Sequence, residues 1–256
     1  MSDGRERLDR LVIARGWAKS RPRAERLITE FGIRVDGQVL HKPGKRVPTD
    51  AVLEPLGEDM PWVSRGAYKL LAALEVWPEI QLNDRIVLDV GSSTGGFTQV
   101  CLERGARGVC AVDTGRDQLD PELHDHPRVA LHEQTNVLDL PPSALEEPFG
   151  TRADLAVVDA SFVSLTLILP GLPPLLKPGG EAVLLVKPQF EVGPTGLGRN
   201  GIVRNAKLHD QSVDRVELAA KQLGAEILGR MVSPVTGGDG NVEFLIWLRF
   251  PSSQSL

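Results

Sequence analysis

A chain of 256 residues, 41% apolar and 25% charged, has the composition of a globular protein with room for one large domain and a small one. No apolar run approaches the roughly 20 residues that cross a bilayer, and the first residues lack the apolar core of a signal peptide, so we expect a cytoplasmic protein with no membrane partner. Cys101 and Cys110 have no Cys-x-x-Cys spacing, which indicates reduced, buried thiols. His124, His126 and His132 lie in a polar, proline-interrupted segment typical of a solvated loop, and no metal site is expected.

The net charge of −5 is unevenly distributed along the chain. Residues 1–50 carry twelve Lys and Arg against seven Asp and Glu, a net charge of +5, whereas the remainder carries −10. A small basic segment in front of an acidic body favours a polyanionic partner for the front end. On charge alone, a solvated charged helix face is the alternative.

The front segment predicts two helices followed by a small sheet. Apolar residues recur at helical spacing over residues 7–16, and a second helix is predicted over 23–31 with Ser20 as its N-cap. Residues 33–35 and 38–40 alternate around Asp36-Gly37, which predicts a hairpin. Residues 52–55 predict a further short strand.

This segment resembles the S4 RNA-binding domain. The matching residues are Arg7-Leu8-Asp9, Gly16, Ser20-Arg21, Ala24, Leu27-Ile28, Val35-Asp36-Gly37 and Lys42-Pro43-Gly44. Basic side chains around the start of the second helix are suited to contact phosphates, and as a cluster they favour RNA over plain solvation. The candidate RNA-binding residues are Arg5, Arg7, Lys19, Arg21, Arg23 and Lys42.

A glycine-rich loop marks the predicted cofactor site. The apolar run 86–88 predicts a buried strand, and helical spacing resumes at Phe97, so the loop joins a strand to a helix. An α/β sheet binds nucleotide-like cofactors at this place. The loop lacks both the Lys of a phosphate-binding GxxxxGK[ST] and the spacing of GxGxxG, which favours S-adenosylmethionine, although a plain tight turn is the alternative. The candidate cofactor-binding residues of the loop are Asp89, Gly91, Ser92, Ser93, Thr94, Gly95, Gly96 and Phe97.

Acidic and amide residues after the next strand extend this site. Asp113 follows the apolar run 109–112, at the distance where a carboxylate accepts hydrogen bonds from a cofactor ribose; a helix cap is the alternative. Asn136 is placed to reach an adenine edge.

The remaining pattern predicts an α/β fold. Strands are predicted at 155–158, 182–186, 227–232 and 244–250, with helices at 164–176 and 213–223 and a turn at 177–180. Alternating strands and helices with one terminal hairpin imply a mostly parallel sheet of seven strands with helices on both faces. Four ionisable residues stand at element ends that should share the cofactor side of the sheet: Lys69, Asp159, Lys187 and Glu243.

The order of motifs over nearly the whole chain is similar to the TlyA family. The motifs are Ser64-Arg65-Gly66-Ala67-Tyr68-Lys69-Leu70, the loop 89–97, Asp159-Ala160-Ser161-Phe162, Lys187-Pro188-Gln189-Phe190-Glu191, Ser233-Pro234-Val235-Thr236-Gly237 and Asn241-Val242-Glu243-Phe244. The resemblance implies an S4-like α+β domain (1–56), an interdomain linker (57–63) and a Rossmann-like, class I, S-adenosylmethionine-dependent methyltransferase domain of the FtsJ type (64–256). It implies 2′-O-methylation of cytidine in 16S and 23S ribosomal RNA of the ribosomal subunits, and it adds Ser64 and Arg65 to the candidate RNA-binding residues.

The resemblance also places the family's Lys-Asp-Lys-Glu tetrad on Lys69, Asp159, Lys187 and Glu243. A ribose hydroxyl must lose its proton to attack the methyl group, and a lysine serves as base when burial or a second cation lowers its pKa. Lys187 is therefore the predicted base, Asp159 and Glu243 orient the ammonium groups, and Lys69 positions the substrate. Phe162 is predicted to pack against the cofactor or a flipped nucleotide.

The sequence departs from the TlyA family pattern at two places. Ser92 replaces the usual alanine, which should leave cofactor binding intact. Met60-Pro61-Trp62-Val63 replaces Arg-Ala-Trp-Val, which affects the coupling of RNA binding to the cofactor pocket.

Two alternative functions remain: a membrane-active hemolysin, the family's other label, and a non-catalytic RNA-binding factor of ribosome assembly. The sequence has no strongly amphipathic cationic helix, which argues against a hemolysin. The intact tetrad argues against a non-catalytic assembly factor.

Overall fold

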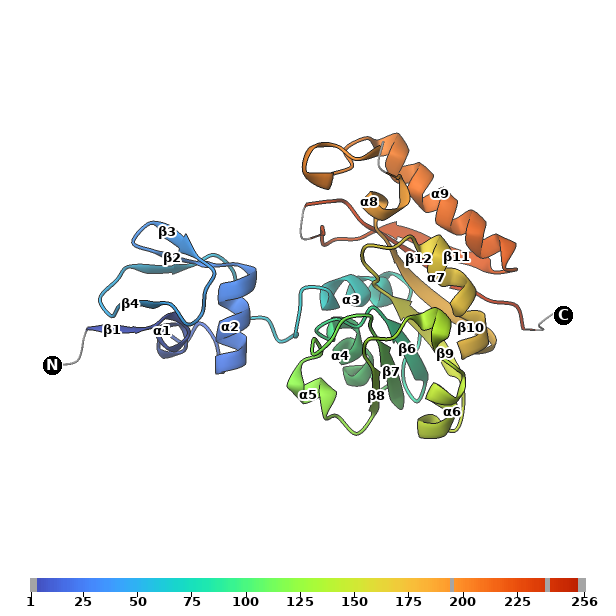
Figure 1. Ribbon diagram of the computed structural model, residues 1–256, viewed down its shortest axis with the longest axis horizontal. Helices are drawn as coiled ribbons and strands as arrows, with labels where there is room; N and C mark the ends of the chain where they lie inside the picture. The colour runs from blue at the N-terminus through green and yellow to red at the C-terminus, as the bar shows by residue number, and fades with distance from the viewer. Residues whose placement is uncertain (1–3, 194–195, 238–239, 253–256) are drawn as a thin grey trace. The chain divides into compact units, whose positions relative to one another are not determined.

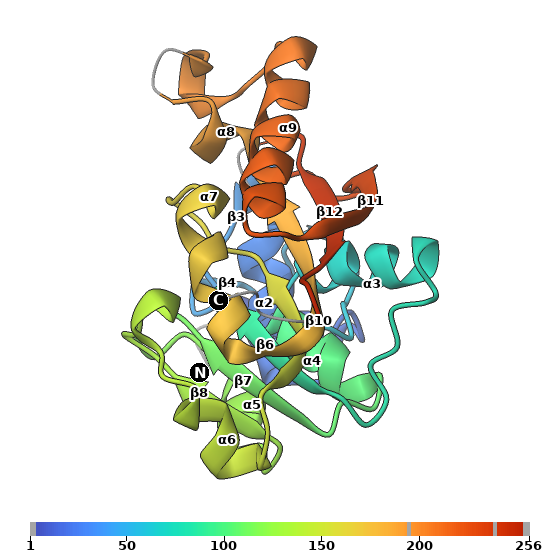
Figure 2. The same ribbon diagram turned by 90° about the vertical axis from the view of Figure 1, so that its right-hand side faces the viewer.

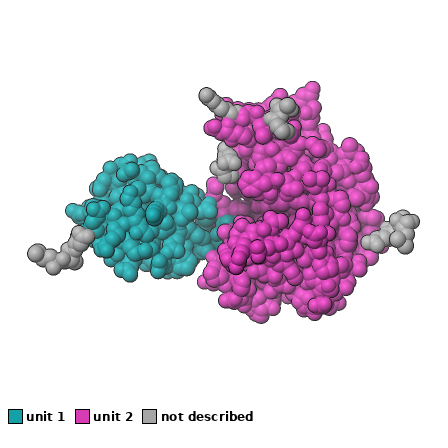
Figure 3. Space-filling model, viewed as in Figure 1, with its two compact units in different colours: residues 1–64 teal, residues 65–256 magenta. Residues whose placement is uncertain are grey.

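The computed structural model of the chain describes residues 4–193, 196–237 and 240–252. The chain divides into two compact units, residues 1–64 and residues 65–256 (Figure 3). Unit 1 combines helices with short strands, and unit 2 is built around one large sheet. Within these described ranges, no helix has the length and apolar character needed to cross a bilayer.

Unit 1 contains two helices and two small sheets. Its elements are β1 (Arg5–Arg7), α1 (Leu8–Ala14), α2 (Arg21–Glu30), β2 (Ile33–Val35), β3 (Gln38–Leu40), β4 (Arg46–Pro48) and β5 (Leu53–Pro55). Strands β3, β2 and β5 form one antiparallel sheet, and β1 pairs with β4 in the other. The predicted hairpin is confirmed, because Asp36 and Gly37 both adopt the positive φ that a tight two-residue turn requires.

The start of α2 and two short strands differ from the predictions for unit 1. Helix α2 begins at Arg21 rather than residue 23, because Pro22 is tolerated in the first turn. Ser20 is the N-cap residue, but its side chain makes no capping hydrogen bond. Strands β1 and β4 were not predicted, since Arg5–Arg7 contains no apolar residue and Arg46–Pro48 contains a proline beside the single aliphatic residue Val47.

Unit 2 confirms the seven-stranded, mostly parallel sheet. The strands are β6 (Ile86–Val90), β7 (Gly108–Val112), β8 (Val129–His132), β9 (Ala153–Val158), β10 (Leu176–Val186), β11 (Glu226–Val232) and β12 (Phe244–Arg249). Their order across the sheet is β11-β12-β10-β9-β6-β7-β8 (Figure 1). Strands β10, β9, β6, β7 and β8 are parallel, whereas β12 runs antiparallel between β10 and β11.

Helices cover both faces of this sheet (Figure 2). They are α3 (Ala67–Val76), α4 (Gly96–Glu103), α5 (Pro121–His124), α6 (Ser143–Phe149), α7 (Leu165–Ile168), α8 (Pro188–Glu191) and α9 (Ala206–Gln222). Apolar side chains of α6, α7 and α9 join those of one sheet face in a single core that contains Leu145, Leu165 and Val213. Helices α3 and α4 pack against each other on the opposite face.

Three predictions for unit 2 are wrong in detail. Of the helix expected over 164–176, only α7 is α-helical. The chain then continues as 3-10 turns, because the prolines at 170, 173 and 174 cannot donate helical hydrogen bonds. The turn expected at 177–180 is an irregularity inside β10, which begins at Leu176. His132 belongs to strand β8 rather than to a loop.

Candidate active site

The topology of the sheet brings three of the four tetrad residues to one edge. Asp159 follows β9 and Lys187 follows β10, at the carboxyl ends of neighbouring parallel strands. Glu243 precedes β12, and Phe244 pairs with Val186. Because β12 is antiparallel to β10, its beginning lies at the edge where β10 ends. The terminal hairpin therefore delivers a carboxylate to the place where an open α/β sheet binds its ligands.

Lys187 and Asp159 form one buried ion pair of this site. The ammonium nitrogen lies 2.6 Å from Asp159 Oδ1. The ammonium also donates a hydrogen bond of 2.7 Å to Ser161 Oγ and a weaker one of 3.5 Å to the carbonyl oxygen of Asp159. The Lys187 side chain is 9% exposed, so its position is fixed by these three acceptors and by burial.

Lys69 and Glu243 form the second pair. Lys69 lies in the first turn of α3, and its ammonium nitrogen is 2.6 Å from Glu243 Oε2. Burial raises the pKa of the Glu243 carboxyl above its usual range; the charges of Lys69 and Lys187 oppose that shift, and the Asp159 carboxylate reinforces it. Glu243 therefore interacts electrostatically with all three other tetrad residues, and the structure brings the predicted tetrad together.

Backbone hydrogen bonds hold the segment around Glu243 in place. The N–H of Ser233 donates to the carbonyl of Glu243, and the N–H of Gly237 donates to the carbonyl of Asn241. A side chain at Gly237 would collide with Glu243, since an added Cβ would lie 2.6 Å from Oε1. Asn241 is buried and ties this turn to the segment before α9 through hydrogen bonds to Val203 N–H and the Gly201 carbonyl.

A cavity of about 660 Å³ adjoins the tetrad. Five predicted cofactor residues line it: Gly91, Ser93, Asp113, Asn136 and Asp159. The wall also contains residues that were not predicted, among them Thr114, Gly115, Gln118, Val137, Leu138, Leu167 and Ile168. The other predicted loop residues are not among the lining residues: Asp89, Ser92, Thr94, Gly95, Gly96 and Phe97.

The glycine-rich loop approaches the end of β9 too closely for a side chain. Gly91 has a φ of +81°, and a Cβ there would lie 2.8 Å from the carbonyl oxygen of Asp159. The loop is fixed on its other side by Asp113, whose carboxylate accepts hydrogen bonds from the N–H groups of Ser93 and Gly115 at 2.8 and 2.7 Å. The contacts place the loop, Asp113 and Asp159 around one cavity.

Asp89 and Ser92 lie buried behind the loop. Asp89 Oδ2 accepts a 2.5 Å hydrogen bond from the Thr98 hydroxyl, whereas Oδ1 and Ser92 Oγ have no hydrogen-bond partner among the described residues. Burial raises the pKa of the Asp89 carboxyl from 3.8 to about 7, and the Asp159 carboxylate contributes in the same direction. Asp89 therefore joins the end of β6 to helix α4 through Thr98.

The cavity suits an adenosyl cofactor that carries a positive charge. Its volume lies within the 300–1,000 Å³ common for small-ligand sites. Asp113 offers carboxylate oxygens that suit a ribose diol, Val137 and Leu138 offer an apolar wall that suits a purine, and Asp159 adds negative charge. Thus the residues present fit S-adenosylmethionine.

Phe162 stands out at the wall of the cavity. Its side chain is 92% exposed, and its φ of +64° lies in the left-handed region that non-glycine residues rarely occupy. The ring lies 5.4 Å from that of Phe190, centroid to centroid. A strained, exposed aromatic residue beside buried catalytic candidates is typical of a functional position.

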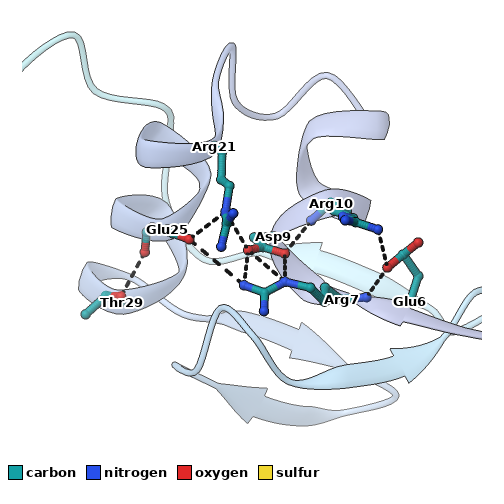
Figure 4. A network of polar contacts seen from close by, with 7 residues as sticks. All are labelled: Glu6, Arg7, Asp9, Arg10, Arg21, Glu25 and Thr29. Carbon is teal, nitrogen blue, oxygen red and sulfur yellow. Dashed lines mark hydrogen bonds and ion pairs between the residues drawn. The ribbon is translucent and has the colours of Figure 1, made fainter.

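A buried carboxylate organises part of the predicted RNA-binding edge of unit 1 (Figure 4). The Arg7 guanidinium bonds both oxygens of Asp9, with Nη2 2.6 Å from Oδ2. Arg21 Nε lies 3.5 Å from the same Oδ2 and 2.9 Å from Glu25 Oε1. The Arg7 guanidinium also packs against Gly44, within the turn that begins at Lys42. The structure thus brings Arg7, Arg21 and this turn together.

The other RNA candidates are placed differently. Arg23 is half-buried, and its guanidinium pairs with Asp59 of the linker at 2.7 Å, so much of its bonding capacity is used within unit 1. Arg5 lies on β1 and donates to the carbonyl of Arg46. Lys19 is exposed. Ser64 ends unit 1, and Arg65 begins unit 2.

Comparisons with known proteins match both units. The S4 domain family matches residues 6–53, and the FtsJ-like methyltransferase family matches residues 62–250. The 16S/23S rRNA (cytidine-2′-O)-methyltransferase TlyA of Mycobacterium tuberculosis is 42% identical over 98% of this chain and 92% of its own length. Hemolysin A of Brachyspira hyodysenteriae is 33% identical over 93% of this chain and 98% of its own length.

A solved structure shares the fold over the same span. Its description names a hemolysin from Streptococcus thermophilus, and it superposes with a TM-score of 0.74 at 38% identity, covering 98% of this chain and 90% of its own. An FtsJ-like methyltransferase behind an S4 domain is therefore the class that fold and site define. The chain belongs to the TlyA family of these enzymes.

Proposed function

We propose that the protein transfers a methyl group from S-adenosylmethionine to the 2′-hydroxyl of cytidine in 16S ribosomal RNA, 23S ribosomal RNA or both. The observation that carries the proposal is the buried Lys187, whose ammonium contacts Asp159 and Ser161, two residues that line the cavity. The named activity of the relative from M. tuberculosis supports the same substrate class.

Residues of the cavity would hold the cofactor. Asp113 would accept hydrogen bonds from the ribose hydroxyls, Asn136 and the apolar wall would contact the adenine, and Asp159 would lie near the positive charge. When bound, S-adenosylmethionine supplies an electrophilic methyl group. The protein then has to align a hydroxyl oxygen with that group and remove the hydroxyl proton.

Lys187 would remove the proton. A neutral amine at its Nζ accepts the 2′-hydroxyl proton as the oxygen attacks, and the resulting ammonium is stabilised by Asp159 at 2.6 Å. Lys69 lies in the same buried group, and a second ammonium nearby favours the neutral form of Lys187. Glu243 holds Lys69 and limits the repulsion between the two lysines.

The basic edge of unit 1 would bind ribosomal RNA. Arg7 and Arg21 present guanidinium groups whose carboxylate partners use only part of their donors. Arg5, Lys19, Lys42, Ser64 and Arg65 are the further candidates, and Arg23 is the weakest because of its pair with Asp59. Such a protein would act in the cytoplasm, on ribosomal subunits.

The test is methyl transfer to isolated 30S and 50S subunits, followed by mapping of 2′-O-methylated positions. We expect Lys187→Ala to abolish transfer while its affinity for S-adenosylmethionine, measured by calorimetry, stays close to that of the unchanged protein. Substantial transfer by Lys187→Ala would refute the assignment of the base. RNA binding without transfer by the unchanged protein would favour an assembly factor, and dye release from liposomes would favour a hemolysin.

A further inference from the structure

Ser161 occupies a position that the proposed chemistry does not yet use. It follows the strand β9 by three residues, in the same turn as Asp159 and Phe162. Its hydroxyl oxygen accepts a 2.7 Å hydrogen bond from the Lys187 ammonium, and Ser161 lines the cavity. The serine is exposed, so this contact is not explained by packing in the core.

The geometry at Lys187 Nζ gives this hydroxyl a role. A tetrahedral amine nitrogen has three directions besides its bond to Cε. The hydrogen bonds to Ser161 Oγ at 2.7 Å and to the carbonyl oxygen of Asp159 at 3.5 Å take two of them, and Asp159 Oδ1 lies 2.6 Å away as the ion-pair partner. When the amine is neutral it has two N–H groups and one lone pair. Two acceptors that hold the two N–H groups therefore fix the direction of the lone pair.

We propose that Ser161 is a positioning residue that, together with Asp159, orients the Lys187 amine so that its lone pair meets the incoming ribose hydroxyl. This inference rests on the proposed function, in which Lys187 is the base. The left-handed φ of Phe162 adds support, because a strained residue next to Ser161 shows that this turn is held in one conformation by its surroundings.

The same contact influences the protonation of Lys187. The charged groups that face it are Asp159 from the end of β9, Glu243 from the start of β12 and Lys69 from α3. Glu191, on the helix that Lys187 caps, is bonded instead to Ser164 and Leu165. Ser161 is thus the neutral hydroxyl acceptor in a hydrogen bond to this ammonium. A hydrogen bond to a charged form favours that form, so its loss should let Lys187 release its proton at lower pH.

The experiment is the pH dependence of single-turnover methyl transfer to 30S and 50S subunits at saturating S-adenosylmethionine. For Ser161→Ala we expect the acidic limb of the rate profile to move to lower pH by about half a unit. We also expect the alkaline plateau to fall about tenfold, because the amine loses its fixed orientation. Ser161→Thr keeps the hydroxyl and should restore both. Ser143→Ala, on α6 away from the cavity, is the matched control.

The outcomes separate this inference from the proposed function. A profile of Ser161→Ala that coincides with that of the active parent protein overturns the role of Ser161 and leaves Lys187 as base. A Ser161→Thr variant as slow as Ser161→Ala also overturns it, since the hydroxyl would then not matter. Unchanged affinity of both variants for S-adenosylmethionine shows that the cavity is intact. An inactive parent protein overturns the proposed function and this inference with it.

Discussion

The substitution Asp89→Asn should remove a pH dependence of the free energy of unfolding that comes from the buried carboxyl group of strand β6. Asp89 is fully buried in β6, and burial raises the pKa of its carboxyl from 3.8 to about 7. Between these two values the unfolded chain has released the proton and the folded chain retains it. Stability falls with pH wherever the folded state binds more protons. The free energy of unfolding should therefore decrease as the pH rises from about 4 to about 7.

The size of the effect follows from the shift. One pKa unit corresponds to about 1.4 kcal/mol, so a rise from 3.8 to about 7 costs the folded protein roughly 4 kcal/mol once the carboxyl is ionised. For a unit of this size, 1 kcal/mol shifts the melting temperature by about 2–4 °C. Asp89→Asn cannot ionise. About two of the three pKa units of the shift, roughly 2.6 kcal/mol, are lost between pH 5 and pH 8, so its advantage in melting temperature over the parent protein should grow by about 5–10 °C over that range.

The assay is thermal unfolding of the cofactor-free protein, followed by calorimetry at pH 5, 6, 7 and 8. Asp117→Asn removes a carboxylate from the exposed surface of the same unit and serves as the control for the change in net charge. Parallel curves of melting temperature against pH for the parent protein and Asp89→Asn would refute the reasoning, because they would show that Asp89 is already ionised in the folded state.

Three further substitutions test the site and the RNA-binding edge. Gly237→Ala places a methyl group 2.6 Å from Glu243 Oε1 and should slow methyl transfer at least about tenfold with unchanged cofactor affinity, as measured by calorimetry; full activity would show that the Glu243 pair is dispensable. Phe162→Gly removes a strained φ worth about 1 kcal/mol, so it should raise the melting temperature by a few degrees while lowering methylation; a lower melting temperature would contradict the strain. Asp9→Asn removes the charged partner of Arg7 and should weaken the binding of ribosomal RNA about tenfold in a filter-binding assay, while unit 1 stays folded. Unchanged binding would show that Asp9 has no part in RNA recognition.

The central strands and the edge strand β11 could be predicted from the sequence, whereas the edge strand β8 and the start of β10 could not. Strands β6, β7 and β9 each contain a continuous apolar run, at 86–88, 109–112 and 155–158, as expected for strands buried on both faces. Strand β8 lies at the edge and is only half-buried along its length, and its apolar run, 129–131, is short and lies between polar residues on both sides. The first part of β10 contains Pro178 and two glycines, whose local signal is that of a turn.

The tetrad residues could be predicted, but their pairing could not. The sequence places Asp159 and Lys187 at strand ends, whereas the pairing of Lys69 with Glu243 depends on the antiparallel course of β12, a property of the assembled sheet. In the sequence, Asp9 is recognisable only as part of the S4-like motif Arg7-Leu8-Asp9. Its burial beneath Arg7 has no signature in the chain, since a carboxylate in a short amphipathic helix normally faces solvent.

The charges of the tetrad bear on how the proposed cofactor and the proposed base influence each other. Lys187 and Lys69 are matched by Asp159 and Glu243, so the buried tetrad is close to neutral while both lysines are protonated. Loss of one proton from Lys187 leaves the group net negative beside a cavity that Asp113 also lines. A sulfonium cation in that cavity favours this deprotonated state, because opposite charges at short range in a buried site attract strongly. Cofactor binding and activation of the base are therefore expected to assist each other.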